Sequence, residues 1–143
     1  MPSFRFVAAV ALSSAVVLFS ACDKPTSPTG VTALSTNDLR LGSGAEVASG
    51  SKVSLNYTLW LFDVSKTDQK GLQIETSVGG TPFTFTIGDG TVIKGWDQGV
   101  TGMRVGGIRR LIVPPSLAYG AERHNAIPAY ATLVFEVELL SIE

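Results

Sequence analysis

Side chains that could carry covalent or metal chemistry are scarce in this sequence. It holds one histidine, His124, and one cysteine, Cys22, which is too few for a metal centre built from nitrogen and sulfur ligands. It has no glycine-flanked serine elbow and no phosphate-binding P-loop motif. The neighbouring acids Glu136 and Glu138 fall on the outward face of a predicted strand. We therefore expect no nucleophile, metal or cofactor, and any reaction should depend on shape, exclusion of water and hydrogen bonds.

Aromatic and branched apolar residues are the remaining candidates for a site. They occupy positions that strand alternation or helical spacing would turn inward: Tyr57, Phe83, Phe85, Trp96, Tyr119 and Phe135, with Val92, Ile93 and Ile127. Residues of this kind often form a core and nothing more, and we adopt that interpretation for Phe85, Leu55 and Val137. The others could instead line an apolar pocket.

The stretch that must position these side chains runs from Pro82 to Met103. It opens with an alternation of phenylalanine and threonine over 83–87, which is typical of a half-buried strand. Gly88-Asp89-Gly90 then predicts a turn. After the turn, apolar residues recur at helical spacing: Val92, Ile93, Trp96, Val100 and Met103. We expect an aromatic strand followed by a short helix that carries Trp96.

Other segments with a period of two predict strands at 52–62, 72–76, 108–113 and 131–142, and a weaker pattern within 31–41 suggests an edge strand. The segments 63–71 and 116–129 have no period and predict loops. About five strands and one short amphipathic helix indicate an α+β fold, in which the helix lies across one face of an antiparallel sheet.

Length and charge restrict the classes of protein. A chain of 143 residues accommodates one domain with extensions. Its net charge of -1 gives no electrostatic basis for binding nucleic acid.

The N-terminus resembles a secretory signal peptide. Arg5 precedes an apolar run over 6–19, which is shorter than the about 20 residues that span a bilayer. The run ends in Ser20-Ala21-Cys22, similar to a bacterial lipobox, in which the cysteine becomes the lipid-modified first residue. An ordinary signal peptide cut after Ala21, or a thiol without a role, are the alternatives.

A segment rich in proline, threonine and serine follows Cys22 and predicts a flexible tether. The expected organisation is a signal peptide over 1–21, the lipidated Cys22 with a tether over 22–32, and a folded domain over 33–143. The expected location is the periplasmic side of a bacterial cell envelope, with a lipid anchor in a membrane.

A series of motifs resembles the FKBP-type peptidyl-prolyl cis-trans isomerase family. They are Tyr57-Thr58, Pro82-Phe83-Thr84-Phe85, VIKGWDQGV over 92–100, Ala118-Tyr119-Gly120, Ile127-Pro128 and ATLVFEVELL over 131–140. Together they cover about residues 31–143 in the right order, which makes the resemblance specific.

The resemblance implies a twisted antiparallel sheet wrapped around one short helix, with an apolar pocket between them. Trp96 would be the floor of the pocket, Ile93 would offer its backbone N–H to a bound carbonyl, and Tyr119 would offer its hydroxyl. The catalytic positions implied are Glu75, Trp96, Tyr119 and Phe135. The substrate-binding positions implied are Tyr57, Ile74, Phe83, Val92, Ile93, His124 and Ile127.

Two positions depart from the family pattern. Ile74 stands where the family has an aromatic residue, and Glu75 stands where it has an aspartate. Both changes alter the position of groups at the pocket, and small displacements matter in catalysis. They predict activity that is reduced rather than absent.

The function expected is a lipid-anchored peptidyl-prolyl isomerase that assists the folding of exported proteins. Its expected partners are proline-containing polypeptides, macrolide inhibitors and a membrane, and we expect a monomer. The main alternative is a binding module or holdase chaperone on the same scaffold, which grips proline segments with little turnover. A structural envelope lipoprotein is the third class.

Overall fold

The computed structural model describes residues 29–143. The predicted signal peptide, Cys22 and most of the tether therefore lie outside the described residues. The strands are β1 (Ser35–Arg40), β2 (Lys52–Phe62), β3 (Lys70–Thr76), β4 (Phe83–Thr86), β5 (Ile108–Val113) and β6 (Leu133–Ile142), and the helices are α1 (Lys94–Val100) and a 3₁₀ turn at Pro115–Leu117. No helix within 29–143 is long and apolar enough to cross a bilayer.

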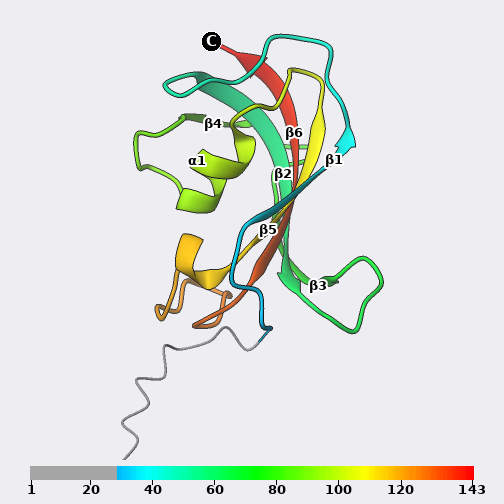
Figure 1. Cartoon of the computed structure of the whole chain (residues 1–143), viewed down its shortest axis with the longest axis vertical. Coiled ribbons are helices and arrows are strands. Elements are labelled where there is room, and N and C mark those ends of the chain that lie inside the picture. The colour runs from blue at the N-terminus through cyan, green and yellow to red at the C-terminus, as the bar shows by residue number, and fades with distance from the viewer. Residues whose placement is uncertain (1–28) are drawn as a thin grey trace, which may run out of the picture.

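The strands form one antiparallel sheet in the order β1-β5-β6-β2-β3, and β4 also pairs with β2 (Figure 1). β2 is the longest strand and pairs with β6 along one edge. Its other edge is shared, because β4 pairs with 52–55 and β3 with 58–62. The predicted α+β fold is confirmed, with six strands instead of about five because 35–40 forms an edge strand on β5.

Strict alternation explains why β2 and β6 lie at the centre of the sheet. Their inward residues are almost completely buried and form much of the core: Val53, Leu55, Leu59, Phe135, Val137 and Leu139. Many outward residues are polar, as predicted for Glu136 and Glu138, which form ion pairs with Lys70 and Arg40. The apolar face of the sheet is therefore the one that packs against α1.

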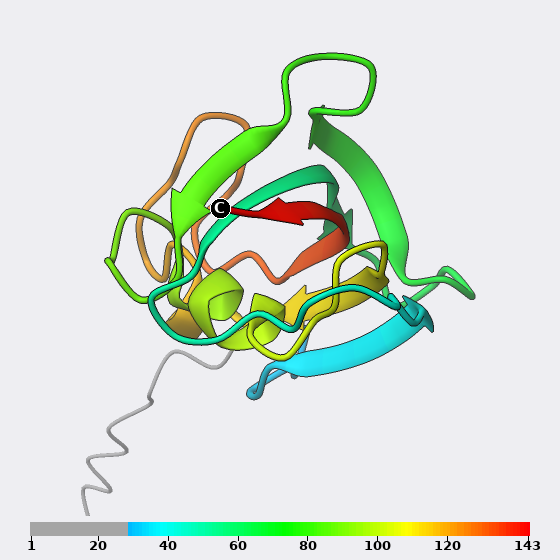
Figure 2. The same cartoon turned by 90° about the horizontal axis from the view of Figure 1, so that it is seen from above.

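Helix α1 lies on the concave side of the sheet (Figures 1 and 2). Two glycines allow this close approach. A Cβ atom at Gly95 would lie 2.4 Å from Cγ1 of Val113, and one at Gly99 would lie 2.8 Å from Cδ2 of Leu111. The glycines thus fix the helix at short distance over β5.

The helix is shorter than the apolar stripe from Val92 to Met103 suggested. Ile93 has extended backbone angles before the first helical residue, and Gly102, with φ of +82°, lies beyond the last turn. Only glycine adopts such a φ without strain. Val92 and Met103 still pack against the core from outside the helix, so the stripe marks buried positions and not helical ones.

Arg109 closes the C-terminal end of α1 from the neighbouring strand β5. Its Nη1 donates to the carbonyl oxygens of Gly99 at 2.9 Å and Thr101 at 3.1 Å, and its Nε donates to Asp38 of β1 at 2.6 Å. A cation at a helix C-terminus is favourable because the last carbonyls have no partner within the helix. This hydrogen bond also holds the pKa of the Asp38 carboxyl below its usual value.

Candidate functional site

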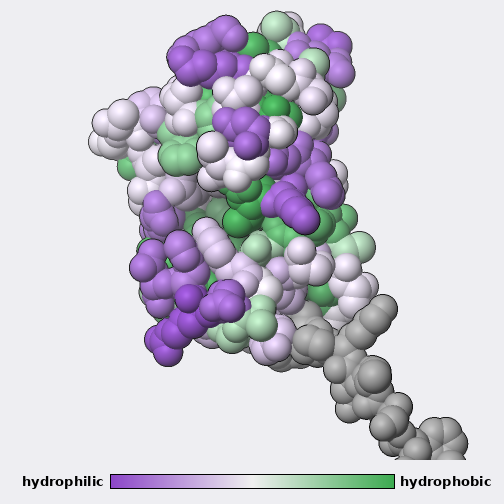
Figure 3. Space-filling model, turned by 90° about the vertical axis from the view of Figure 1, so that its left-hand side faces the viewer, coloured by the Kyte–Doolittle hydropathy of each residue, from purple (hydrophilic) through white to green (hydrophobic). Residues whose placement is uncertain are grey.

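A cavity of about 830 Å³ opens between α1, the concave face of the sheet and the loops that precede α1 and follow β5. Seen from the side on which α1 lies, apolar surface gathers in the middle of the molecule between hydrophilic margins (Figure 3). The size and the apolar lining are those of a small-ligand or peptide pocket.

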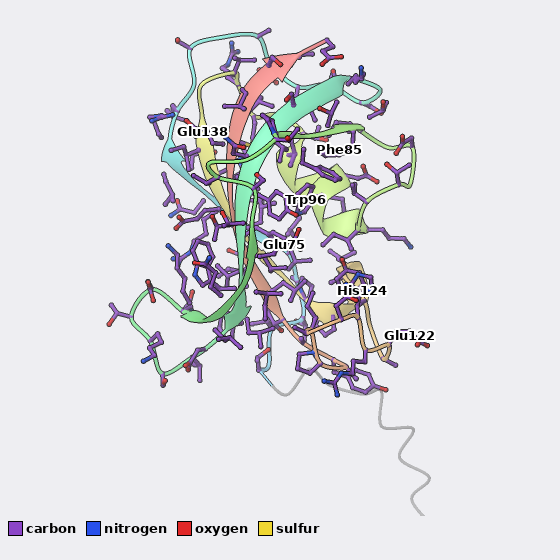
Figure 4. All side chains as sticks on the ribbon, turned by 180° about the vertical axis from the view of Figure 1, so that it is seen from behind. Glu75, Phe85, Trp96, Glu122, His124 and Glu138 are labelled. Atoms are coloured by element: carbon purple, nitrogen blue, oxygen red, sulfur yellow. The ribbon has the colours of Figure 1, made fainter. Side chains whose placement is uncertain are left out.

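Trp96 lies at the centre of the aromatic cluster and is only 5% exposed. Its ring centroid is 5.0 Å from that of Tyr57, 5.3 Å from Phe135 and 5.6 Å from Phe83, with interplanar angles of 77–84°. Edge-to-face contacts of this kind are the favoured geometry of aromatic pairs. Phe85 packs beside it as core, as predicted (Figure 4). The cluster gives the cavity a rigid, dry floor.

The indole N–H of Trp96 is buried and makes no hydrogen bond with another residue of 29–143. A buried donor without a partner is unusual in a folded protein. The indole N–H is thus a donor at the cavity floor that an acceptor on a ligand or an ordered water would satisfy.

Tyr57 and Glu75 form a polar pair on the wall of the cavity. The Tyr57 hydroxyl donates a hydrogen bond to Oε1 of Glu75. Burial, and then this hydrogen bond and the charge of Glu75, raise the pKa of the Tyr57 hydroxyl well above its usual value. The extra methylene of Glu75 therefore does not prevent the carboxylate from reaching the phenol.

Tyr119 and His124 form the opposite margin of the cavity, on the loop after β5. Their rings stack with centroids 4.2 Å apart and an interplanar angle of 4°. Burial, followed by the negative charge of Glu75, raises the pKa of the Tyr119 hydroxyl. The hydroxyl therefore stays protonated at neutral pH and can donate a hydrogen bond. In Figure 4, Trp96, Glu75 and His124 lie on the same side of the sheet, and Glu122 points away.

The loop between β4 and α1 supplies the third side of the cavity. Val92 and Ile93 are half-buried, line the cavity and pack against the core. The carbonyl of Ile93 accepts the backbone N–H of Trp96 at 3.0 Å, whereas the backbone N–H of Ile93 donates to no other residue of 29–143. This N–H is therefore available to an acceptor on a ligand.

The structure brings most of the sequence-predicted site residues together around this cavity. Those that line it are Tyr57, Glu75, Phe83, Val92, Ile93, Trp96, Tyr119, His124 and Phe135. Ile74 and Ile127 are not part of the lining. Ile74 is half-buried against the core, and Ile127 is only 3% exposed within it. Cys22 lies outside the described residues.

Several lining residues were not foreseen from the sequence: Leu59, Gly90, Thr91, Lys94, Asp97, Ser116 and Ala118. Lys94 and Asp97 flank Trp96 closely, so their place in the chain was a usable signal. Ala118 belongs to the motif Ala118-Tyr119-Gly120, which was also a usable signal, whereas Ser116 lies in a segment without periodicity.

A second, smaller cavity of about 260 Å³ lies where β1 meets β5, lined in part by Arg40, Arg104 and Arg109. Each of these arginines forms an ion pair with a carboxylate, so each positive charge at this cavity has a partner within the protein. Within 29–143 no three acidic, histidine or cysteine side chains are placed to hold a metal ion.

The comparison with known proteins agrees with this geometry. Residues 44–140 match the family model for FKBP-type peptidyl-prolyl cis-trans isomerases. FK506-binding protein 1 of Aspergillus oryzae is 46% identical over 105 residues, which cover 71% of this chain and 90% of that protein. The crystal structure of AtFKBP13 has a TM-score of 0.66 and 34% identity, and the match covers 82% of this chain and 97% of that one.

Longer relatives match over part of their length. The chloroplastic peptidyl-prolyl cis-trans isomerase FKBP16-4 of Arabidopsis thaliana is 46% identical over 110 residues, which are 74% of this chain and 46% of that protein. FK506-binding protein 4 of Chaetomium thermophilum is 46% identical over 107 residues, which are 75% of this chain and 21% of that protein. The chain thus spans less than half the length of these two relatives. With the sheet, the helix and the aromatic cavity in place, the match over 44–140 shows that the chain belongs to the FKBP-type peptidyl-prolyl cis-trans isomerase family.

Proposed function

We propose that the cavity catalyses the cis-trans isomerisation of X-Pro peptide bonds. The observation that carries the proposal is the ring of Tyr57, Phe83 and Phe135 around the buried Trp96. A proline ring is compact and apolar and suits such a floor. The free Ile93 N–H and the Tyr119 hydroxyl are the donors for the substrate's carbonyl groups.

The physics of the reaction fits a dry cavity. Rotation of an amide bond passes a barrier of about 18–20 kcal/mol, set by resonance. Resonance is lost in the twisted form, and with it much of the amide dipole. Water solvates the planar form better than the twisted one, so an apolar site favours the twisted form relative to water. Lowering the barrier by ~4 kcal/mol gives about a thousandfold acceleration.

The test is the rate of exchange between the cis and trans forms of a short proline peptide, followed by NMR. The wild-type protein should accelerate the exchange. Trp96→Leu should abolish most of the acceleration, because it removes the floor. The chain offers a matched control in Trp60→Leu, since Trp60 lies under Lys70 on the other face of the sheet. Equal loss in both variants, with folding intact by circular dichroism, would contradict the assignment.

The alternative of a holdase or binding module is an outcome of the same experiment. Peptide resonances that shift on binding without faster exchange would select it. The contact between Glu75 and Tyr57 favours catalysis over this alternative, since the wall of the cavity keeps its polar pair.

We also propose that the cavity binds macrolides of the FK506 type, because the fungal relatives are named FK506-binding proteins. FK506 should compete with the proline peptide for the cavity. Loss of the enhanced exchange at saturating FK506 is the expected result.

We propose that the protein is a lipid-anchored monomer of a bacterial cell envelope, with the boundaries 1–21, 22–32 and 33–143, and that it acts on exported proteins. The support is the apolar run that ends in Ser20-Ala21-Cys22; the relatives named above come from fungi and a plant. Cys22→Ala should move the protein from the membrane to the soluble fraction. Retention of Met1–Ala21 on the wild-type protein would overturn the proposal.

A further inference from the structure

The loop from Gly88 to Ile93 carries four of the residues that line the cavity, yet few hydrogen bonds hold it. Its tip is closed by local hydrogen bonds, since Asp89 accepts from the backbone N–H and the hydroxyl of Thr91. Asp89 N–H in turn donates to the last residue of β4, Thr86, at 3.4 Å. These bonds shape the loop but do not connect it to α1.

One side chain makes that connection. Oδ1 of Asp97, in the first turn of α1, accepts the backbone N–H of Gly88 at 2.8 Å. Among the described residues no other side chain outside the loop is hydrogen-bonded to 88–92. Asp97 directly follows Trp96 and itself lines the cavity.

The conformation of the loop depends on this contact, because its own backbone restricts it little. Gly88 and Gly90 have φ values of +86° and +79°, and glycine at such positions leaves many alternative conformations open. At its far end the loop is fixed by the start of α1, where the Ile93 carbonyl accepts the backbone N–H of Trp96. Asp97 fixes its near end.

We propose that Asp97 is a positioning residue for substrate binding. Through Gly88, its carboxylate holds the loop in the conformation that presents the Val92 side chain and the Ile93 N–H to the cavity. The inference rests on the proposed function, because it assigns the loop a role in holding a prolyl peptide. Pre-organisation of this kind raises affinity by lowering the entropy lost on binding.

Three variants test the proposal. Asp97→Ala removes the acceptor and should raise KM for a prolyl peptide by about tenfold with a smaller change in kcat, because the aromatic floor is untouched. Asp97→Asn keeps an oxygen acceptor at the same position and should recover most of the lost affinity. Gln98→Ala changes the next, exposed residue of α1, which is not part of the lining, and serves as the matched control.

Amide hydrogen exchange gives a readout independent of activity. In the wild type, the Gly88 N–H should exchange more slowly than the Gly90 N–H, which has no acceptor among the described residues. The difference should disappear in Asp97→Ala and persist in Asp97→Asn. A purely structural role would instead lower thermal stability in Asp97→Ala without a selective rise in KM.

Each result decides the matter. Equal exchange of Gly88 and Gly90 in the wild type, or an unchanged KM in Asp97→Ala, overturns the inference. If Asp97→Ala does not fold, two measurements remain. The Gly88 N–H must exchange more slowly than the Gly90 N–H in the wild type, and Asp97→Asn must keep most of the wild-type affinity. If the wild type binds the peptide without accelerating its exchange, the proposed function fails, and the peptide's Kd replaces KM in the same comparison.

Discussion

The hydroxyls of Tyr57 and Tyr119 are two of the polar groups that line the cavity, and the pKa of both is raised by burial and by Glu75. Tyr57 is engaged with Glu75, whereas Tyr119 contacts its neighbourhood through its ring, stacked on His124. The two phenols therefore differ: the Tyr57 hydroxyl is bonded to the wall, and the Tyr119 hydroxyl has no hydrogen-bond partner among the described residues, as its proposed role as a substrate donor requires.

Tyr119→Phe should lower kcat/KM by about tenfold, the effect of one lost hydrogen bond of ~1.4 kcal/mol in the transition state. Thermal stability should change little, because the ring and its stack on His124 remain. Tyr130→Phe makes the same chemical change at a tyrosine outside the cavity lining and should leave kcat/KM unaltered. A Tyr119→Phe variant as active as the wild type would remove the hydroxyl from the mechanism.

The raised pKa values predict how stability depends on alkaline pH. Both phenols lose their protons at higher pH in the folded protein than in the unfolded chain, whose value is 10.0. The folded state therefore binds more protons above that pH, and the stability that these groups contribute is complete below about pH 10 and lost as the pH rises further. Tyr57→Phe should make the decline shallower.

Denaturant unfolding between about pH 9 and pH 11.5 measures this effect. The wild-type protein and Tyr57→Phe are compared at each pH, so that the titration of lysines cancels. An identical decline in the two proteins would show that Tyr57 titrates normally in the folded state.

Helix α1 depends on β5 for its position, through the two glycines that face Val113 and Leu111. Helix propensity alone favours alanine over glycine by about 1 kcal/mol. Gly95→Ala should nevertheless destabilise the protein by about 1–3 kcal/mol, because the new methyl group would lie 2.4 Å from Cγ1 of the buried Val113.

The partner residue offers a test of that cause. Val113→Ala in the Gly95→Ala background should cost less than Val113→Ala in the wild type, since it removes the clash. The free energies of unfolding of the four proteins form a double-mutant cycle. Additive losses would mean that α1 shifts away from β5 without strain.

The sequence predicted the elements with the clearest periodicity and missed those that depend on loop geometry. β2 and β5 have their predicted bounds, because their alternation is strict. The short helix was predicted as well, but the apolar stripe did not give its ends, because Val92 and Met103 are buried by extended and turn segments that continue the stripe. The family motifs located the aromatic part of the cavity.

The remaining features could not be obtained from any local pattern. Arg109 lies in a strand, yet it donates a hydrogen bond to the carbonyl of Gly99 near the end of α1, ten residues earlier in the chain. In the sequence Asp97 is an ordinary polar residue of a helix. Only the structure shows that the Gly88 N–H donates to its carboxylate. Ile127 belongs to a family motif and is buried in the core here. Each depends on how distant segments meet in space.

The whole molecule is joined at its middle by β6, which pairs with β5 on one side and β2 on the other. Without it, the sheet would separate into a β1-β5 ribbon and a β2-β3-β4 ribbon with no strand pairing between them. Deletion of residues 133–143 should therefore abolish the cooperative unfolding transition and not merely lower its midpoint. Circular dichroism during thermal unfolding checks this; a residual sharp transition would show that one ribbon folds alone.

The place of β6 in the chain also determines when the protein can fold during its synthesis. β6 is the last of the six strands in sequence order, so the ribosome makes it after all its partners. At about 5–20 residues per second, translation of residues 1–132, which precede β6, takes roughly 7–26 s. Throughout that time the nascent chain lacks the strand that unites its core. The inward faces of β2 and β5 therefore stay without the strand that lies between them until residues 133–142 have been made.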